Sequence, residues 1–237
     1  MAKKRRPSPQ GSDSPEDALS ARLIALTSWA RENTQVVIIA GIVLAIALAA
    51  GLYYYNFQQD VRMQAAEEFE RIQQTVVGVG DTQTALTELQ TFLDRFGDTP
   101  LAAEARLLLA EAHLHEGSPQ QAVETLQPVV GNLARPISIQ AAFLLGSAYE
   151  EATQYGDAED IYLRISEEAE LTFQVRNALA AAARMRAEQE NYAGAAELYR
   201  QVLDTYEDEE EGAAATAAGD RAMYQLRLSE MEAMANG

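Results

Sequence analysis

Few residues of this 237-residue chain are of the types that catalyse reactions or hold metals. It contains no Cys, so it offers no thiolate nucleophile, no disulfide and no Cys-based metal site. Its only histidines, His113 and His115, stand two residues apart and point to different faces of a helix. We expect His113 to be packed, and no His–Glu spacing typical of a zinc site surrounds the pair. The sequence therefore predicts no catalytic residue, no metal site and no cofactor.

Carboxylates are the most abundant reactive groups, and their distribution is uneven. The net charge is −18, and residues 56–237 contain thirty-two Asp and Glu, twelve Arg and no Lys. Such an acidic segment argues against binding to nucleic acid or to anionic lipid head groups. Acidic helices usually present a solvated face, so these carboxylates do not predict an enzyme.

An uncharged run of twenty residues, Val36 to Tyr55, precedes the acidic segment. As a helix it would span about 30 Å, the thickness of the hydrocarbon core of a bilayer. We predict a single transmembrane helix over residues 35–56. The alternative is a cleaved signal peptide, since Ala47-Leu48-Ala49 resembles a cleavage site. The thirty-five preceding residues and the length of the run both argue against that alternative.

Positive charge predicts the orientation of this helix. Only Arg62 and Arg71 follow the run within about twenty residues. The positive-inside rule therefore places the N-terminus in the cytoplasm and the acidic segment in the periplasm, in an inner (plasma) membrane. Six basic residues precede the run: Lys3, Lys4, Arg5, Arg6, Arg22 and Arg31.

The N-terminal arm divides into two predicted parts. Residues 1–13 are basic and rich in Pro and Ser, which is typical of a disordered tail. An amphipathic helix is predicted over residues 14–34, with Ser14 as its N-cap and a break at Asn33-Thr34. It would lie on the cytoplasmic membrane surface or bind a cytosolic protein, and the sequence does not choose between these.

The acidic segment contains four similar helical units, which begin at residues 66, 103, 139 and 176. Each holds two amphipathic helices around a turn, at Thr75–Thr82, His115–Pro119, Thr153–Asp157 and Gln189–Ala193. In the second helices an Ala leads by four residues to a large side chain, in the pairs Ala85–Leu89, Ala122–Leu126, Ala158–Tyr162 and Ala195–Tyr199. The first helices align at Ala110, Gly146 and Ala183, where small residues allow paired helices to approach closely.

Local signals refine these boundaries. Ser118 to Gln121 has the pattern of a capping box with Pro119 in the first turn, and Pro128 should kink that helix or end it early. Residues 207–237 are predicted to form an acidic linker and a C-terminal capping helix, with Ala222, Leu226 and Met231 on its covering face.

The repeats resemble the tetratricopeptide repeat (TPR), which has a small residue in its first helix and A-x-x-x-[FY] in its second. Ala158-x-x-x-Tyr162 and Ala195-x-x-x-Tyr199 match this pattern. Gln73 departs from it in the first unit, as does Arg186, which replaces an aromatic residue in the fourth. The resemblance implies an all-α fold: the transmembrane helix, then a TPR-like α-solenoid of about four helical hairpins over residues 57–206, and a capping helix.

The resemblance also implies a partner-binding groove on the concave surface made by the first helices. The chain lacks the Lys and Asn set of the carboxylate-clamping variety, offering only Asn177 and Arg184. A basic or apolar extended segment would suit an acidic groove with an apolar centre. The motif positions that bind partners map to Glu67, Glu70, Gln74, Glu104, Leu107, Glu111, Leu114, Phe143, Glu150, Glu151 and Glu188.

The layout of arm, anchor and repeats resembles the YfgM-like ancillary subunits of the SecYEG translocon. The matching segments are Trp29 to Asn33, the anchor, and Val61-x-x-x-Ala65. The resemblance implies a non-enzymatic, membrane-anchored interaction adaptor, with translocon subunits, periplasmic chaperones or exported chains as partners.

A structural envelope scaffold is the alternative function. Residues 92–96 and 199–203 resemble repeats of Tol-Pal-associated and outer-membrane-assembly proteins. Gly41, Ala45 and Ala49 recur at four-residue steps on one face of the anchor, where small residues allow transmembrane helices to pack. This face makes a homo-oligomer possible.

Overall fold

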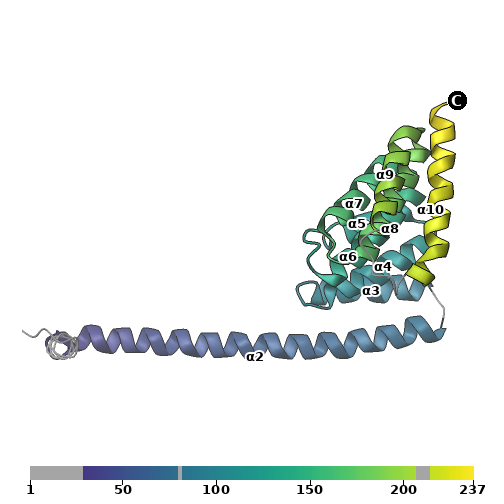
Figure 1. Cartoon of the computed structure of the whole chain (residues 1–237). Helices are drawn as coiled ribbons and strands as arrows, with labels where there is room; N and C mark the ends of the chain where they lie inside the picture. The colour runs from purple at the N-terminus through teal and green to yellow at the C-terminus, as the bar shows by residue number, and fades with distance from the viewer. Residues whose placement is uncertain (1–28, 80–81, 207–213) are drawn as a thin grey trace, which may run out of the picture. The chain divides into compact units, whose positions relative to one another are not determined.

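The computed structural model describes residues 29–79, 82–206 and 214–237, all of them in helices or in the turns between helices (Figure 1). No strand occurs among these residues, in agreement with the predicted all-α class. The helices are α2 (Thr34–Val79), α3 (Thr82–Phe96), α4 (Ala102–His115), α5 (Pro119–Leu126), α6 (Pro136–Glu151), α7 (Tyr155–Glu168), α8 (Thr172–Glu188), α9 (Tyr192–Asp204) and α10 (Ala214–Ala235).

The chain divides into two compact units, residues 1–60 and 61–237. In the first unit, residues 29–32 are helical and Asn33 forms a turn before α2. Here the amide nitrogen and side-chain amide of Asn33 both donate to the carbonyl oxygen of Trp29, at 2.9 and 3.0 Å. Residues 1–13 and most of the helix predicted over 14–34 lie outside the described residues.

The apolar part of α2 is long and hydrophobic enough to cross a membrane, with a mean hydropathy of 2.7. Its apolar side chains are exposed in this structure: Ile46 is 64% exposed and Leu52 66%. Helix α2 does not end with the apolar run at Tyr55. It continues without interruption to Val79.

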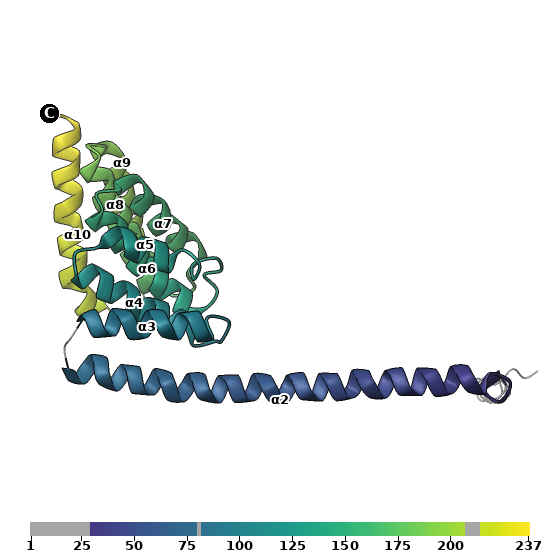
Figure 2. The ribbon, with the colours of Figure 1, turned by 180° about the vertical axis from the view of Figure 1, so that it is seen from behind.

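The second unit is a stack of helices in which each helix packs against the next one along the chain and runs antiparallel to it (Figures 1 and 2). Three predicted turns lie within two residues of their expected places: α4 ends at His115, α6 at Glu151 and α8 at Glu188. Helix α2 extends further than predicted: it is helical as far as Val79, within the turn expected at Thr75–Thr82, because no Pro interrupts its hydrogen bonds.

Recurring positions of the repeats form the core of the stack. All four alanines of the second helices are buried, as are the four large residues that follow them. On α6, Gly146 is also buried, and the ring of Tyr162 from α7 lies so closely over it that an added Cβ would stand 2.5 Å from Cε1. This contact explains why the place takes a small residue.

Helix ends follow the sequence in part. Helix α5 begins at Pro119 and ends at Leu126, two residues before Pro128. The predicted capping box is wrong, because the side chain of Ser118 makes no capping hydrogen bond. An unpredicted cap is present at α9, where Asn191 Oδ1 accepts from the amide nitrogen of Gly194 at 3.0 Å.

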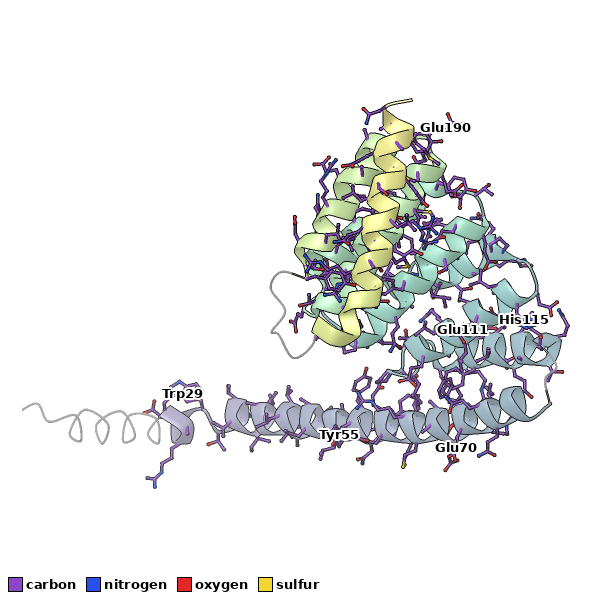
Figure 3. The ribbon with its side chains drawn as sticks, turned by 45° about the vertical axis from the view of Figure 1, so that its right-hand side comes forward. Trp29, Tyr55, Glu70, Glu111, His115 and Glu190 are labelled. Carbon is purple, nitrogen blue, oxygen red and sulfur yellow. The ribbon has the colours of Figure 1, made fainter. Side chains whose placement is uncertain are left out.

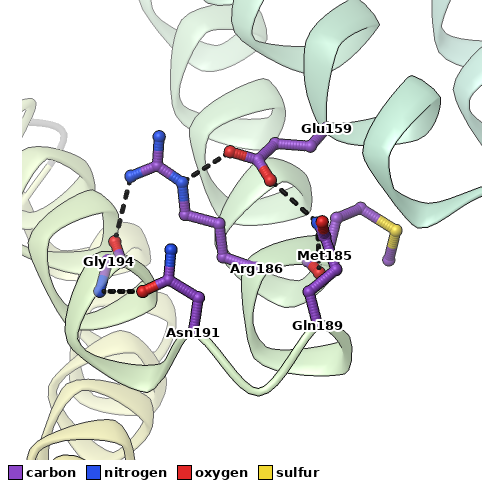
Figure 4. Close-up of polar contacts among 6 residues, drawn as sticks. All are labelled: Glu159, Met185, Arg186, Gln189, Asn191 and Gly194. Atoms are coloured by element: carbon purple, nitrogen blue, oxygen red, sulfur yellow. Dashed lines mark hydrogen bonds and ion pairs between the residues drawn. The ribbon is translucent and has the colours of Figure 1, made fainter.

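Arg186, the departure from the motif in the fourth repeat, joins three helices (Figure 4). Its Nε donates to Glu159 Oε1 on α7 at 2.5 Å, and its Nη1 donates to the carbonyl oxygen of Gly194 on α9 at 3.3 Å. The other oxygen of Glu159 accepts from Gln189 Nε2 at 2.9 Å. A polar bridge thus replaces the aromatic contact expected at this place.

Helix α10 packs against α9 and closes the stack (Figure 2). The predicted covering face is shifted: Met231 is buried, but Leu226 is 59% exposed and Ala222 is also exposed. Tyr224 and Leu228 contact the core instead, because they share a helix face with Met231 at steps of four and three. The ring of Tyr224 lies 6.3 Å from that of Tyr199 and 6.4 Å from that of Tyr206.

Candidate functional site

The first helices of the repeats enclose a groove of about 1040 Å³ in the second unit. Short steps of three and four residues bring one face of each helix to the groove, such as Gln174, Asn177, Ala181 and Arg184 on α8. Its apolar wall consists of Phe69, Leu107, Leu108, Ile137, Ile139, Phe143, Leu144 and Phe173. Of these, Phe173 is 55% exposed, so the wall presents apolar surface to whatever enters the groove.

Polar groups interrupt this wall in two ways. Two carboxylates, Glu104 and Glu111, stand one helical turn before and after Leu107 and Leu108 (Figure 3 labels Glu111). Both are exposed, and neither forms an ion pair with a described residue. Amide side chains from three helices also line the groove: Gln73, Gln140, Gln174 and Asn177. Carboxylates attract cations, and amides both donate and accept hydrogen bonds, so a peptide backbone could be bound here.

Where the groove meets α7 and α8, a chain of hydrogen bonds connects Tyr162, Glu150 and Arg184. Tyr162 Oη donates to Glu150 Oε1 at 2.6 Å, and Arg184 donates to both carboxylate oxygens of Glu150 at 3.1 and 3.3 Å. Burial, and then the nearby Glu150 carboxylate, raise the pKa of Tyr162 well above its usual value, so the phenol stays protonated and donates. The guanidinium of Arg184 is thereby placed at the groove with its charge already paired.

The groove contains four of the ten residues predicted for it: Glu104, Leu107, Glu111 and Phe143. Glu150 borders it through its bonds to Tyr162 and Arg184. The other five do not line it: Glu67, Glu70, Leu114, Glu151 and Glu188. The same is true of Gln74.

Helix rotation explains these exceptions. On α2 the buried residues are Ala65, Phe69 and Ile72, so Glu67 and Glu70 fall on the opposite side (Figure 3 labels Glu70). Leu114 packs against the main core. Glu151 and Glu188 are the exposed last residues of α6 and α8.

Sequence reasoning missed several lining residues, chiefly Phe69, Ile139, Gln140, Phe173 and Gln174. The signal that could have found Gln140 was present, because Gln140, Phe143, Leu144 and Ser147 recur at helical steps on α6. Phe173 carried the same signal on α8, where it stands four residues before Asn177 and eight before Ala181.

A smaller hollow of about 290 Å³ adjoins the groove and shares Asn177, Ala181 and Arg184 with it. Its other walls include Tyr199 from α9 and Met223 from α10. Apolar and polar lining therefore continues from the first repeat to the capping helix.

His113 lies away from the groove, in a hollow of about 500 Å³ with Asp94, Arg106 and Glu124. Burial lowers the pKa of His113, which favours the neutral ring. In the part of the chain that the structure describes, no group of three or more His, Asp or Glu side chains could hold a metal ion.

Comparisons with known proteins agree with this architecture. The family described as "Tetratricopeptide repeat-like domain" matches residues 27–158, and the "Tetratricopeptide repeat" family matches residues 178–213. No curated protein is similar enough in sequence to count as a match.

Solved structures that are similar to this chain have low sequence identity to it. The TPR-like repeats of a Podosopora anserina chain described as a kinesin light chain are 19% identical, with a TM-score of 0.50 over 72% of this chain and 94% of that one. MamA from Desulfovibrio magneticus RS-1 is 16% identical, with a TM-score of 0.49 over 73% of this chain and 96% of that one. Because the first family covers more than half of the residues, the chain belongs to the tetratricopeptide repeat-like domain family.

Proposed function

We propose that this protein is a membrane-anchored adaptor whose repeats bind other proteins on the side of the membrane opposite to its N-terminus. TPR folds typically serve as non-enzymatic interaction scaffolds, and here the repeats follow a helix apolar enough to span a bilayer. The excess of basic residues before the span supports a cytoplasmic N-terminus and a periplasmic repeat domain.

The proposed partners are subunits of the Sec translocon and the periplasmic chaperones that receive exported chains. The family match begins at residue 27, before the apolar run, so the family model includes the anchor as well as the first repeats. A domain that begins directly after the anchor meets its partners close to the membrane, where exported chains emerge.

Co-purification tests this placement. When the full chain is extracted from membranes in a mild detergent, translocon subunits should be recovered with it, and the yield should fall to background for a variant that lacks residues 61–237. Absence of translocon subunits from both samples, with other envelope proteins recovered instead, would contradict the assignment of partner.

The groove suits an extended, apolar segment that carries basic residues. Its wall of apolar side chains would accept apolar side chains of the segment, and the amides of Gln140, Gln174 and Asn177 could pair with its backbone. The observation that carries this proposal is the position of Glu104 and Glu111 beside Leu107, both carboxylates without an ionic partner among the described residues.

Charge reversal inside the groove should therefore weaken binding more than the same reversal outside it. We expect Glu104→Lys with Glu111→Lys to lower recovery of the partner about tenfold, or roughly 1.4 kcal/mol. Glu67→Lys with Glu70→Lys is the matched control, because it makes the same change of charge on the outer side of α2.

Photocrosslinking locates the contact directly. A photoreactive residue at Leu107 or Phe143 should capture the partner in cells, while one at Gln90 or Gln121, in the separate hollow around His113, should not. Equal capture from both sets of positions, or equal loss in both pairs of charge variants, would show that the groove is not the binding site.

A structural envelope scaffold remains the alternative function. Its supporting observation is the face of Gly41, Ala45 and Ala49 in α2, where an added Cβ on Gly41 would meet nothing within 4 Å. Replacing Gly41 and Ala45 with Leu should change the oligomer size if this face packs against another anchor.

A further inference from the structure

Helix α10 exposes an apolar flank that the capping role does not use. Tyr224, Leu228 and Met231 face the core, whereas Met223 is 46% exposed, Leu226 59% and Met234 55%. Met223 and Met234 are eleven residues apart, so at about 100° per residue they lie within about 20° of one another on the helix. The long exposed side of α10 can be followed in Figure 3.

We propose that this flank, defined here by Met223, Leu226, Arg227, Glu230 and Met234, is a self-association surface through which two copies of the chain pair with α10 antiparallel. The midpoint of the flank falls between Leu228 and Ser229. Met223 and Met234 are equally far from that point, and so are Arg227 and Glu230.

A twofold axis through this midpoint makes the surface complementary to itself. It sets Met223 against Met234 of the second copy, and Arg227 against Glu230 of the second copy. Each contact occurs twice, as an isologous interface requires. Arg227 and Glu230 now form an exposed pair within one helix at 3.0 Å, with side chains 56% and 38% exposed, so both are accessible to a second copy.

This pairing does not depend on what the groove binds, although Met223 and Arg227 also border the smaller hollow. A single helix contact buries little area, and such contacts are weak between free molecules. Copies tethered in one membrane, as proposed above, meet at a high effective concentration, which favours the pairing.

Cysteine crosslinking in membranes tests the geometry, because the chain has no native Cys. Co-expression of one full chain carrying Met223→Cys with another carrying Met234→Cys should give a disulfide-linked dimer of the two variants. Either variant alone should give none: in the antiparallel pair two copies of one position are separated by about 16.5 Å, and a disulfide needs Cα atoms within about 7 Å. Gln225→Cys with Asn236→Cys is the matched control, with the same spacing on the other side of α10.

Charge swapping tests the ionic contacts separately. Arg227→Glu alone places Glu against Glu, and Glu230→Arg alone places Arg against Arg, so each variant should lose at least fivefold in dimer yield. Co-expression of these two variants restores both ion pairs and should restore the yield.

The cysteine crosslinking and the charge swap test self-association separately from partner binding in the groove. A dimer from Met223→Cys alone would show parallel pairing, and capture of a different protein from Met223 would assign the flank to that protein; either result overturns the proposal. Partner recovery through Leu107 should stay unchanged in Glu230→Arg, because Glu230 lines neither the groove nor the smaller hollow. Failure of self-association therefore leaves the groove assignment standing.

Discussion

Replacing Gly146 with Ala should destabilise the repeat domain by about 2 kcal/mol and lower its melting temperature by roughly 4–8 °C. An Ala Cβ would overlap Cζ of Tyr162 and would stand 2.5 Å from Cε1 and 2.8 Å from Oη of the same ring. Because these atoms belong to a rigid, buried ring, α6 and α7 must separate to admit the methyl group. Overpacking of this kind typically costs about 1–3 kcal/mol, and it outweighs the gain of up to about 1 kcal/mol from helix propensity.

The chain supplies a matched control for this prediction. Gly219 also lies within a helix, but an added Cβ there would meet nothing within 4 Å. Gly219→Ala should therefore leave the melting temperature unchanged or raise it slightly.

Thermal unfolding of the full chain in detergent, followed by circular dichroism, measures both variants. In a Tyr162→Ala background, the Gly146→Ala change should no longer destabilise. If it costs the same with and without the Tyr162 ring, the contact between α6 and α7 is not the cause.

Replacing Arg186 with Met should cost about 2 kcal/mol, the range for buried hydrogen bonds to charged groups. The side chains of Arg186 and Glu159 are only 24% and 16% exposed, so the carboxylate left behind is poorly solvated. Among the described residues, the Glu159 carboxylate would keep one hydrogen-bond donor, Gln189 Nε2 at 2.9 Å. The carbonyl oxygen of Gly194 would lose the bond that Arg186 donates to it. Denaturant unfolding of the variant measures this loss as a shift of the transition midpoint at unchanged slope.

Two comparisons identify the cause of that loss. Arg200→Met breaks a pair with Glu232 at 2.7 Å whose side chains are 53% and 45% exposed, and it should cost less than about 0.5 kcal/mol. The double variant Arg186→Met with Glu159→Met should be more stable than Arg186→Met alone, because no unpaired carboxylate remains. A double variant that is less stable than the single one would show that an unpaired carboxylate is not the cause of the loss.

The fold was largely predictable from the sequence because it depends on local periodicity. Alanines at fixed steps before Leu or Tyr, as in Ala158 and Tyr162, marked the second helices, and each proved buried. Pro119 stands in the first turn of α5, as its place in the sequence predicted. Both signals act within one or two helical turns, so no tertiary information was needed.

The groove was predictable only in part. Leu107 and Phe143 were found by their places in the repeat motif, and they do line the groove. Glu67 and Glu70 were placed there by the same mapping, but the buried face of α2 turns them away. Motif positions assume that every first helix has the same rotation, and in the first repeat that rotation is set by packing of Phe69 against Phe92, whose ring centroids lie 5.4 Å apart.

The sequence by itself determined the class of the chain: a charge-free helix near one end, then helical repeats in an acidic segment without catalytic or metal-binding motifs. Only the tertiary structure decided which side chains share a surface. It joined Tyr162, Glu150 and Arg184 from three helices, used Arg186 where an aromatic residue was expected, and left one flank of α10 uncovered. The physical reason is that periodicity orients side chains around one helix, whereas contacts between helices depend on how each helix is rotated by the residues it buries.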